Sequence, residues 1–368
     1  MKNYLFGLFL LTGLVACDNT EGVKELVDSA KRVEMIVVNE GQFTKGSASL
    51  TAIYEDGIVE NEVFRKVNGR PLGDVAQSIS YINGLYYVVL NNSKKVEVIE
   101  PHTFKSVATI NYDQQGSPRY ITPLSDSEAL VSDLGRQVVR INTKKFEVLE
   151  YISLNSSIEQ MVTLGGKVFG CSGRDIVVFD TNKITQEGMR KVSGLEGSLF
   201  KTAKLVVDKS NKIWVMAQGQ GKGLLHCIDP EQEAVIYTYE FPIIASSNTE
   251  NYVEGCITGI ASFPRIDTDR TKSKLYFDLR VLSNKKNVQV IYLFDMDTKE
   301  FKPYSNLLGM GMMYGMGVSP DGDIILCDCL DYSAQRGYIR QYKRNDEDII
   351  SRRVGIYPTM VHFTEYDK

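Results

Sequence analysis

The chain has 368 residues, 43% of them hydrophobic, and carries 42 Lys and Arg against 46 Asp and Glu, a formal net charge of −4. The balanced charge excludes a typical nucleic-acid-binding protein, and the hydrophobic content excludes a disordered chain. Six Cys are too few for a disulfide scaffold, and the three His lie too far in sequence from one another and from Cys for a zinc site. We therefore expect no metal site, no cofactor and no nucleic-acid partner.

The N-terminal segment predicts a lipid-anchored, exported protein. An apolar run from Tyr4 to Leu11 is too short to span a membrane and is typical of a signal peptide. The sequence Leu14-Val15-Ala16-Cys17 resembles the lipobox of bacterial lipoproteins, in which the Cys thiol is diacylated and becomes the new N-terminus. We expect cleavage to remove residues 1–16 and residues 17–34 to form the lipidated Cys17 and a flexible tether. Ordinary secretion with cleavage at the same bond is the alternative, although it would not require a Cys there.

From residue 35 onward, short segments rich in Val, Ile, Tyr and Phe are separated by Asn, Asp, Gly and Ser, which predicts strands and hairpins throughout. One strand type recurs seven times and ends in polar residues in most copies; the copies are Met35–Asn39, Leu85–Asn91, Glu128–Asp133, Lys167–Ser172, Lys212–Gln218, Lys274–Leu282 and Asp323–Asp328. A second type, such as Val96–Glu100, follows each copy. The repeat has a period of about 48 residues, which is in the range of four-stranded propeller blades.

A third strand type precedes the first in each repeat, but only six copies lie in their expected places. The seventh, Pro358–Phe363, lies at the C-terminus, so we expect it to complete the blade that residues 35–69 begin. The prediction is an all-β fold, a seven-bladed β-propeller of four-stranded antiparallel blades over residues 35–368, because a closed ring leaves only short, protected edges. A β-sandwich and a β-helix are the alternatives, but sandwiches lack such repetition and parallel β-helices use shorter repeats.

In four-stranded blades, the loops that enter the innermost strand and those that join the second strand to the third lie on one face around the central channel. Here these loops are rich in amides, Arg, aromatic residues and Gly. Amides and Arg donate to carbonyl and phosphate oxygens, and aromatic rings supply rigid contact area. The candidate ligand-binding residues are Asn39, Glu40, Gln42, Phe43, Arg70, Asn91, Asn92, Arg119, Asp133, Arg136, Arg174, Gln218, Tyr252, Tyr314 and Tyr332. Asn, Gly and Asp are also what tight hairpins require, but a turn has no need of the Arg and aromatic residues in this set.

Three stretches resemble a group of propeller lipoproteins of gut anaerobes that is related to the YncE-like and surface-layer-type propellers. They are Asn39–Phe43, Val67–Ser78 and Val88–Ser93. The group includes surface lipoproteins that capture vitamin B12. The resemblance implies an outer-membrane lipoprotein, exposed on the cell surface, that captures a ligand and works with a TonB-dependent transporter in nutrient uptake. A cobalamin-type corrinoid suits the loop chemistry because it is broad, is fringed with amides and carries one phosphate. A protein-docking propeller within a nutrient-uptake complex is the alternative.

Other motifs carry little chemistry. The segment Gly219–Gly223 lacks the spacing of a phosphate-binding loop. Paired acids in turns lack the distal Glu of a calcium loop, although a structural Ca²⁺ remains an alternative. We expect the Cys residues after Cys17 to be buried small hydrophobes. A propeller lyase or lactonase is disfavoured because its loops would need a metal or a His/Glu pair, and these loops offer Glu40 and almost no His. We therefore expect a binding protein and no enzyme.

Overall fold

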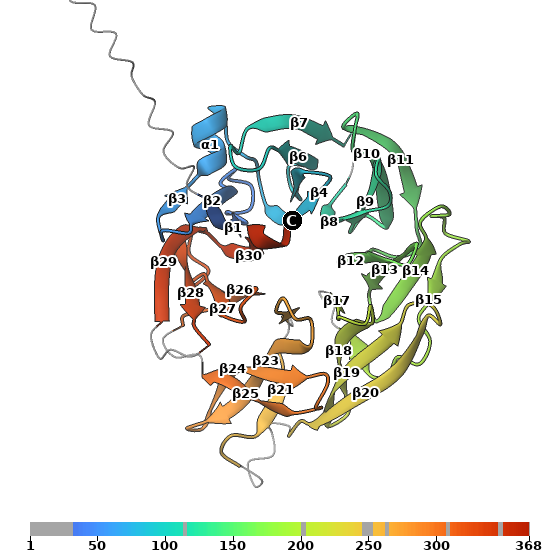
Figure 1. Cartoon of the computed structure of the whole chain (residues 1–368), viewed down its shortest axis with the longest axis vertical. Helices are drawn as coiled ribbons and strands as arrows, with labels where there is room; N and C mark the ends of the chain where they lie inside the picture. Colours follow the sequence, from blue (N-terminus) through green and yellow to red (C-terminus); the bar gives the residue numbers. More distant parts are fainter. Residues whose placement is uncertain are drawn as a thin grey trace, which may run out of the picture.

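The computed structural model describes residues 32–112, 116–199, 204–244, 253–261, 265–306, 310–344 and 349–367. Within these residues, strands form seven antiparallel sheets arranged as a ring around a central axis (Figure 1). The predicted all-β, seven-bladed propeller is confirmed. The predicted signal peptide, the lipidated Cys17 and most of the predicted tether lie outside the described residues.

The blades are named here in chain order, with strands given from the axis outward. The first blade contains β30(Pro358–Phe363), β1(Val33–Asn39), β2(Ser49–Tyr54) and β3(Val59–Asn61). The second contains β4(Ala76–Ile82), β5(Leu85–Leu90), β6(Lys95–Ile99) and β7(Ser106–Asn111). The third contains β8(Pro118–Pro123), β9(Glu128–Asp133), β10(Gln137–Asn142) and β11(Glu147–Ser153). The fourth contains β12(Met161–Leu164), β13(Lys167–Ser172), β14(Asp175–Asp180) and β15(Arg190–Lys191).

In the fifth and sixth blades, two short strands share the innermost position. The fifth contains β16(Ser198–Leu199) and β17(Val206–Val207), then β18(Ile213–Gly219), β19(Lys222–Asp229) and β20(Ala234–Pro242). The sixth contains β21(Ile257–Ile260) and β22(Ile266–Thr268), then β23(Lys274–Ser283), β24(Lys286–Asp295) and β25(Phe301–Asn306). The seventh contains β26(Met313–Val318), β27(Ile324–Asp328), β28(Arg336–Tyr342) and β29(Ile349–Ile356).

The hydrophobic core is divided into seven clusters, each of which lies between two neighbouring blades. One cluster joins Tyr87 and Val96 of the second blade to Val131 and Val139 of the third. A middle strand therefore packs on both sides, and every residue of β9 after Glu128 is buried, whereas the outermost strand β11 is mostly exposed. This packing explains why the middle strands are almost continuously apolar in the sequence.

The C-terminal strand closes the ring. β30 pairs antiparallel with β1, with Met35 opposite Phe363 and Val37 opposite Val361. These four side chains form one cluster with Ile325 and other apolar residues of the seventh blade. The expectation that the C-terminal strand completes the N-terminal blade is confirmed.

The ring has two distinct faces. Both ends of the propeller lie on one of them, the terminus face, where the hydroxyl Oγ1 of Thr364 donates to the carbonyl oxygen of Val33 at 2.6 Å. The 3₁₀ helix η2(Thr364–Asp367) follows β30 there. The opposite face, which we call the loop face, carries the turns between second and third strands, residues 40–48, 91–94, 134–136, 173–174, 220–221, 284–285 and 329–335.

Candidate functional site

An acid and a phenol meet on the loop face where the first and seventh blades join. Glu40 follows β1, and its backbone N–H donates to the carbonyl oxygen of Tyr357 at 2.9 Å. Its carboxylate oxygen Oε2 accepts a hydrogen bond from the hydroxyl of Tyr314 on β26 at 2.8 Å. Burial raises the pKa of Glu40 above its ordinary value, although the hydrogen bond from Tyr314 and the positive charge of Arg119 oppose the rise. Glu40 is therefore more easily protonated than an exposed glutamate.

A second group of polar side chains comes from three consecutive blades. Arg119 on β8 donates through Nε to Oε2 of Glu159 at 2.8 Å and through Nη1 to Oε1 of Gln77 on β4. Gln77 and Glu159 are almost fully buried. Within the described residues, Nη2 of Arg119 makes no hydrogen bond, so the guanidinium is held in place and keeps donors for a ligand. We call Glu40, Gln77, Arg119, Glu159 and Tyr314 the polar cluster.

Aromatic side chains of the first and seventh blades lie on the same face as Glu40. The rings of Tyr314 and Tyr357 lie 6.0 Å apart, and the Tyr357 hydroxyl donates to the carbonyl oxygen of Tyr332 at 2.6 Å. Tyr332 is 68% exposed, and Phe43, on the same turn as Glu40, is 64% exposed. Large aromatic rings left in solvent on one face are typical of a binding surface.

Four of the predicted amides and acids have structural roles instead. Asn39 is fully buried, donates to the Thr51 hydroxyl at 3.0 Å and accepts from the backbone N–H of Gly355 at 2.9 Å. Asp133 is also fully buried and accepts from the backbone N–H groups of Gly135 and Ser117 at 2.6 and 2.8 Å. In both residues, side-chain oxygens accept hydrogen bonds from backbone N–H groups where each turn meets the chain segment that enters the blade.

The second blade uses its two consecutive asparagines in a similar way. Asn91 donates to the hydroxyl of Ser117 at 2.8 Å and to the carbonyl oxygen of Pro118 at 3.0 Å. Asn92 donates to the carboxylate of Asp74 at 2.6 Å. These amides connect neighbouring loops and are already partnered.

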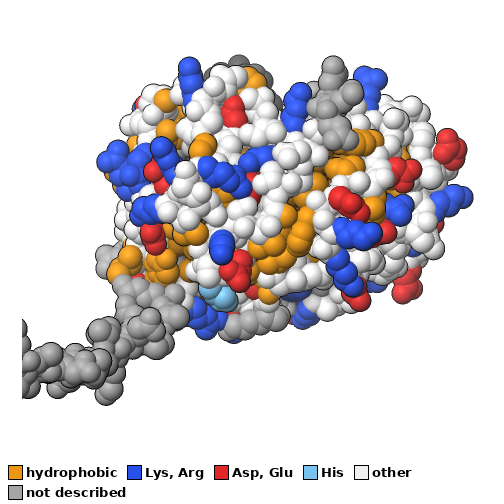
Figure 2. Space-filling model, turned by 90° about the horizontal axis from the view of Figure 1, so that it is seen from above, with side chains coloured by type: hydrophobic (Ala, Val, Ile, Leu, Met, Phe, Trp, Pro, Cys, Tyr) orange, Lys and Arg blue, Asp and Glu red, His pale blue; other side chains and the backbone are white. Residues whose placement is uncertain are grey.

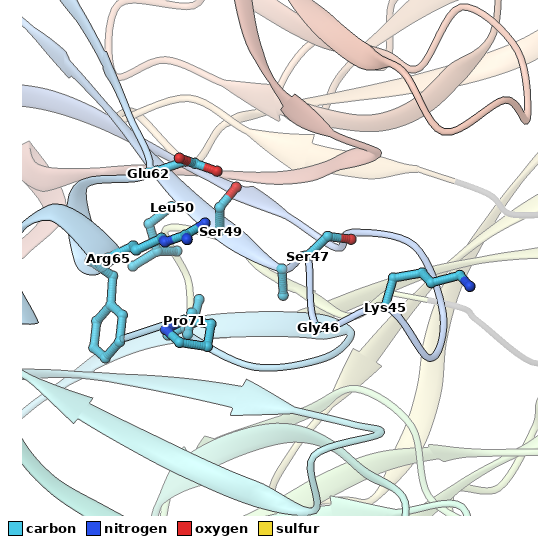
Figure 3. Close-up of a pocket in the computed structure, with 11 residues that line it drawn as sticks. Lys45, Gly46, Ser47, Ser49, Leu50, Glu62, Arg65 and Pro71 are labelled. Carbon is cyan, nitrogen blue, oxygen red and sulfur yellow. The ribbon is translucent and has the colours of Figure 1, made fainter. Parts of the chain in front are cut away.

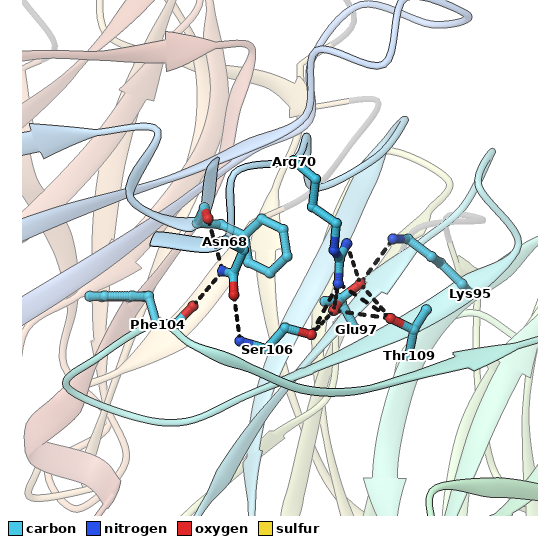
Figure 4. Close-up of polar contacts among 8 residues, drawn as sticks. Asn68, Arg70, Lys95, Glu97, Phe104, Ser106 and Thr109 are labelled. Carbon is cyan, nitrogen blue, oxygen red and sulfur yellow. Dashed lines mark hydrogen bonds and ion pairs between the residues drawn. The ribbon is translucent and has the colours of Figure 1, made fainter. Parts of the chain in front are cut away.

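Arg70, another predicted ligand-binding residue, forms an ion pair with a buried carboxylate, while its own side chain stays 40% exposed (Figure 4). Its Nη2 lies 2.6 Å from Oε1 of Glu97, whose side chain is fully buried on β6, and its guanidinium lies 4.9 Å from the ring centroid of Phe64. Lys95 binds the other carboxylate oxygen of Glu97 at 2.9 Å. Burial on its own would raise the pKa of Glu97, but the hydrogen bonds from Arg70 and its other partners outweigh it, so this pKa is lowered. Arg70 thereby fixes the segment after α1(Val63–Asn68) to the second blade.

The remaining predicted residues are scattered over the loop face. Arg136 and Arg174 are exposed in two turns, Gln218 is half-buried on β18, and the backbone N–H of Gln42 donates to the hydroxyl of Ser47 at 2.8 Å. Tyr252 lies outside the described residues. Gln77, Glu159 and Tyr357 are not among the residues that the sequence predicts. Each is a polar or aromatic residue near the start of an innermost strand, and this position is the feature by which the sequence could have indicated them.

A pocket of about 180 Å³ lies in the first blade, between the turn after β1 and α1. Leu50, Leu72 and other apolar residues line it together with Ser49, Glu62 and Arg65. Figure 3 shows Glu62 and Arg65 extending toward Ser49, whereas Lys45 points away from them. The helix α1 has no counterpart in the other blades of the described chain, so this pocket is specific to the first blade.

Neither a metal centre nor a charged belt stands out. No three His, Cys, Asp or Glu side chains of the described residues are grouped as a metal ion would require. The side of the ring in Figure 2 carries both positive and negative side chains, which are interspersed.

In the described part of the chain, no helix is long and apolar enough to cross a membrane. Cys171, Cys227, Cys327 and Cys329 are buried free thiols, as expected, whereas Cys256 is a free thiol that is only half-buried, contrary to the expectation.

The fold and this site define a propeller protein with a polar and aromatic loop face. The chain belongs to the family described as "Domain of unknown function (DUF5074)", whose model matches residues 34–321. No curated protein matches the sequence significantly.

Solved structures share the fold at low sequence identity. A quinonprotein alcohol dehydrogenase-like protein of Bacteroides thetaiotaomicron matches with a TM-score of 0.65 and 13% identity over 90% of this chain and 78% of that chain. A Bacteroides fragilis protein provisionally assigned as a 6-phosphogluconolactonase matches with a TM-score of 0.60 and 12% identity over 90% and 98%. The dihydro-heme d1 dehydrogenase NirN matches with a TM-score of 0.56 and 12% identity over 92% and 77%. Enzymes are thus among the structural neighbours, but at this identity the likeness extends to the fold alone.

The ion pair of Arg70 can be tested by mutation. Arg70→Ala should lower the free energy of unfolding by about 1–3 kcal/mol at neutral pH, because Glu97 stays buried with one charged donor fewer. Arg136→Ala, a change in an exposed turn, should alter it by less than about 0.5 kcal/mol. Urea denaturation measures both.

The same pair predicts a pH dependence. Because the pKa of Glu97 is lowered in the folded state, its contribution is present above the pKa of the unfolded chain and is lost as the pH falls through the folded-state pKa. The difference between wild type and Arg70→Ala should therefore shrink in acid. A difference that stays constant into acid would contradict this role of Arg70.

Proposed function

We propose that this protein is a lipoprotein, anchored in the outer membrane through Cys17, that captures a bulky ligand on its loop face at the cell surface. The observation that carries the proposal is the position of the polar cluster and its aromatic rim on the face opposite both chain ends. A tether that leaves the propeller near Arg32 would then direct the loop face away from the membrane. A ligand could reach Phe43 and Tyr332 from outside the cell.

The ligand that we propose is cobalamin or a related corrinoid, which the protein passes to a TonB-dependent transporter. Exposed rings such as Phe43 and Tyr332 suit the broad face of such a ligand. The guanidinium of Arg119 suits the amide oxygens and the phosphate at its edge. The sequence resemblance of residues 39–93 to B12-capturing lipoproteins supports the same ligand class.

We propose binding without catalysis. In the described chain, His226 is held inside the fifth blade by Thr238 and the carbonyl oxygen of Glu196, and His362 is bound to Asp367 near the terminus face. His102 lies in the turn between β6 and β7 on the terminus face, so none of the three histidines lies in the polar cluster with Glu40. A general acid-base pair of the kind that a propeller lyase would use has no support there.

Calorimetric titration of the mature, detergent-solubilised protein with cyanocobalamin tests the ligand. We expect saturable heat at micromolar protein. The double variant Phe43→Ala/Tyr332→Ala should weaken binding about tenfold or more, because exposed aromatic anchors dominate such surfaces. Val107→Ala, which alters an exposed residue on β7, is the control and should bind like wild type. Absence of heat from wild type would refute the corrinoid.

Metabolic labelling with palmitate tests the anchor. Wild type should incorporate the label, and Cys17→Ala should lose it, because the acyl chains are attached to this residue. Labelling that persists in Cys17→Ala would refute the lipid anchor.

A further inference from the structure

A larger pocket lies on the terminus face, where turns of the fifth and sixth blades come together. Its volume is about 320 Å³, and it is far from the loop-face site because it is built by turns at the opposite ends of the strands. The turn before β18 and the turns before β23 and after β24 supply its rim. The backbone N–H of Lys209 donates to the carbonyl oxygen of Lys272 at 3.0 Å and joins two of these turns. The pocket is thus a fixed feature of the blade junction.

Apolar and aromatic side chains form its wall. Trp214, the only tryptophan of the chain, lines the pocket and packs edge-on against Tyr237 with ring centroids 6.1 Å apart. Its Nε1 donates to the carboxylate of Asp208 at 2.8 Å, which fixes the indole. Ile236 on the same wall is 47% exposed. The wall therefore retains apolar area that a ligand could cover.

Four lysines line the pocket beside this wall, and two of them form no ion pair with a carboxylate of the described chain. Lys209 pairs with Asp297 at 2.5 Å, and Lys212 pairs with Asp229 at 2.8 Å. Lys272 and Lys299 make no ion pair with any carboxylate of the described chain.

Lys299 is held directly at the aromatic wall. Its ammonium lies 4.6 Å from the ring centroid of Tyr237 and 5.9 Å from that of Trp214, and it donates to the carbonyl oxygen of Met296 at 2.6 Å. Ring faces attract a cation but do not neutralise it. The lining holds these four lysines against Asp208 and Asp297, and Lys212 also pairs with Asp229, so the pocket combines an apolar wall with a net positive charge.

We propose that this pocket binds a small amphipathic anion, a molecule with an apolar ring or chain and one carboxylate, sulfonate or phosphate group. The apolar part covers Ile236 and Tyr237, and the anionic group lies between Lys272 and Lys299. The volume of this pocket lies at the lower end of the range of small-molecule sites. The assignment rests on the pocket alone and is independent of the function proposed for the loop face.

The single tryptophan makes the test direct. Mature protein is titrated with 8-anilinonaphthalene-1-sulfonate while Trp214 is excited, and in parallel with the uncharged N-phenyl-1-naphthylamine. We expect the sulfonate to bind at one site per chain, to quench Trp214 and to gain emission by energy transfer, and the uncharged probe to bind more weakly. Equal affinity for the two probes would overturn the proposal.

Variants locate the site. Lys272→Met and Lys299→Met should each weaken sulfonate binding about three- to tenfold, the effect of losing one partly screened charge pair. Lys144→Met, an exposed lysine on the same face of the third blade, is the matched control and should bind like wild type. Ile236→Glu places a carboxylate, which repels the anionic probe, on the exposed wall. It should abolish binding without disturbing the core. Unchanged affinity in Lys272→Met and Ile236→Glu would refute the site even if Lys299→Met failed to fold.

Competition separates two sources of the anion. Laurate below its micelle concentration should displace the probe if the pocket takes free amphipathic anions. Vesicles of phosphatidylglycerol, but not of phosphatidylcholine, should displace it if the anion belongs to a lipid. Displacement by neither would contradict the assigned ligand class.

Discussion

The pairing of β30 with β1 is the interaction on which the rest of this structure depends. Every blade buries apolar side chains on both of its sides, so a blade at an open end would expose half of a cluster to water. Pairing of Met35 with Phe363 and of Val38 with Met360 removes that open end and also satisfies the backbone groups of β1. The edges that remain are the innermost strands, which line the central axis, and the outermost strands, such as β11, which is mostly exposed.

Closure also creates the candidate site. Glu40 comes directly after β1, and Tyr314 belongs to the seventh blade, so their hydrogen bond exists only where the two ends of the chain meet. The same junction brings Tyr357 and Tyr332 together. The two faces of the ring thus differ for a simple reason: one holds both chain ends, and the other holds the turns between the second and third strands.

The fold could be predicted because a period near 48 residues and seven copies of each strand type are visible in the sequence. The site could be predicted only in part. Asn39 and Asp133 end corresponding strands of two blades, and such recurrence indicates a structural role that the two blades share. Tyr314 and Tyr332 do not recur in this way. The role of Arg70 depends on the insertion of α1 and on the buried face of Glu97, and the pocket at Trp214 depends on turns from two blades. Neither arrangement is visible in local sequence.

Native-state hydrogen exchange tests the central claim most directly. If ring closure holds the blades together, the paired amides of β1 and β30 should exchange as slowly as those of the middle strands β5 and β27, and all should exchange through global unfolding. Amides of β1 and β30 that exchange much faster, at the rate of an exposed edge strand such as β11, would contradict the account.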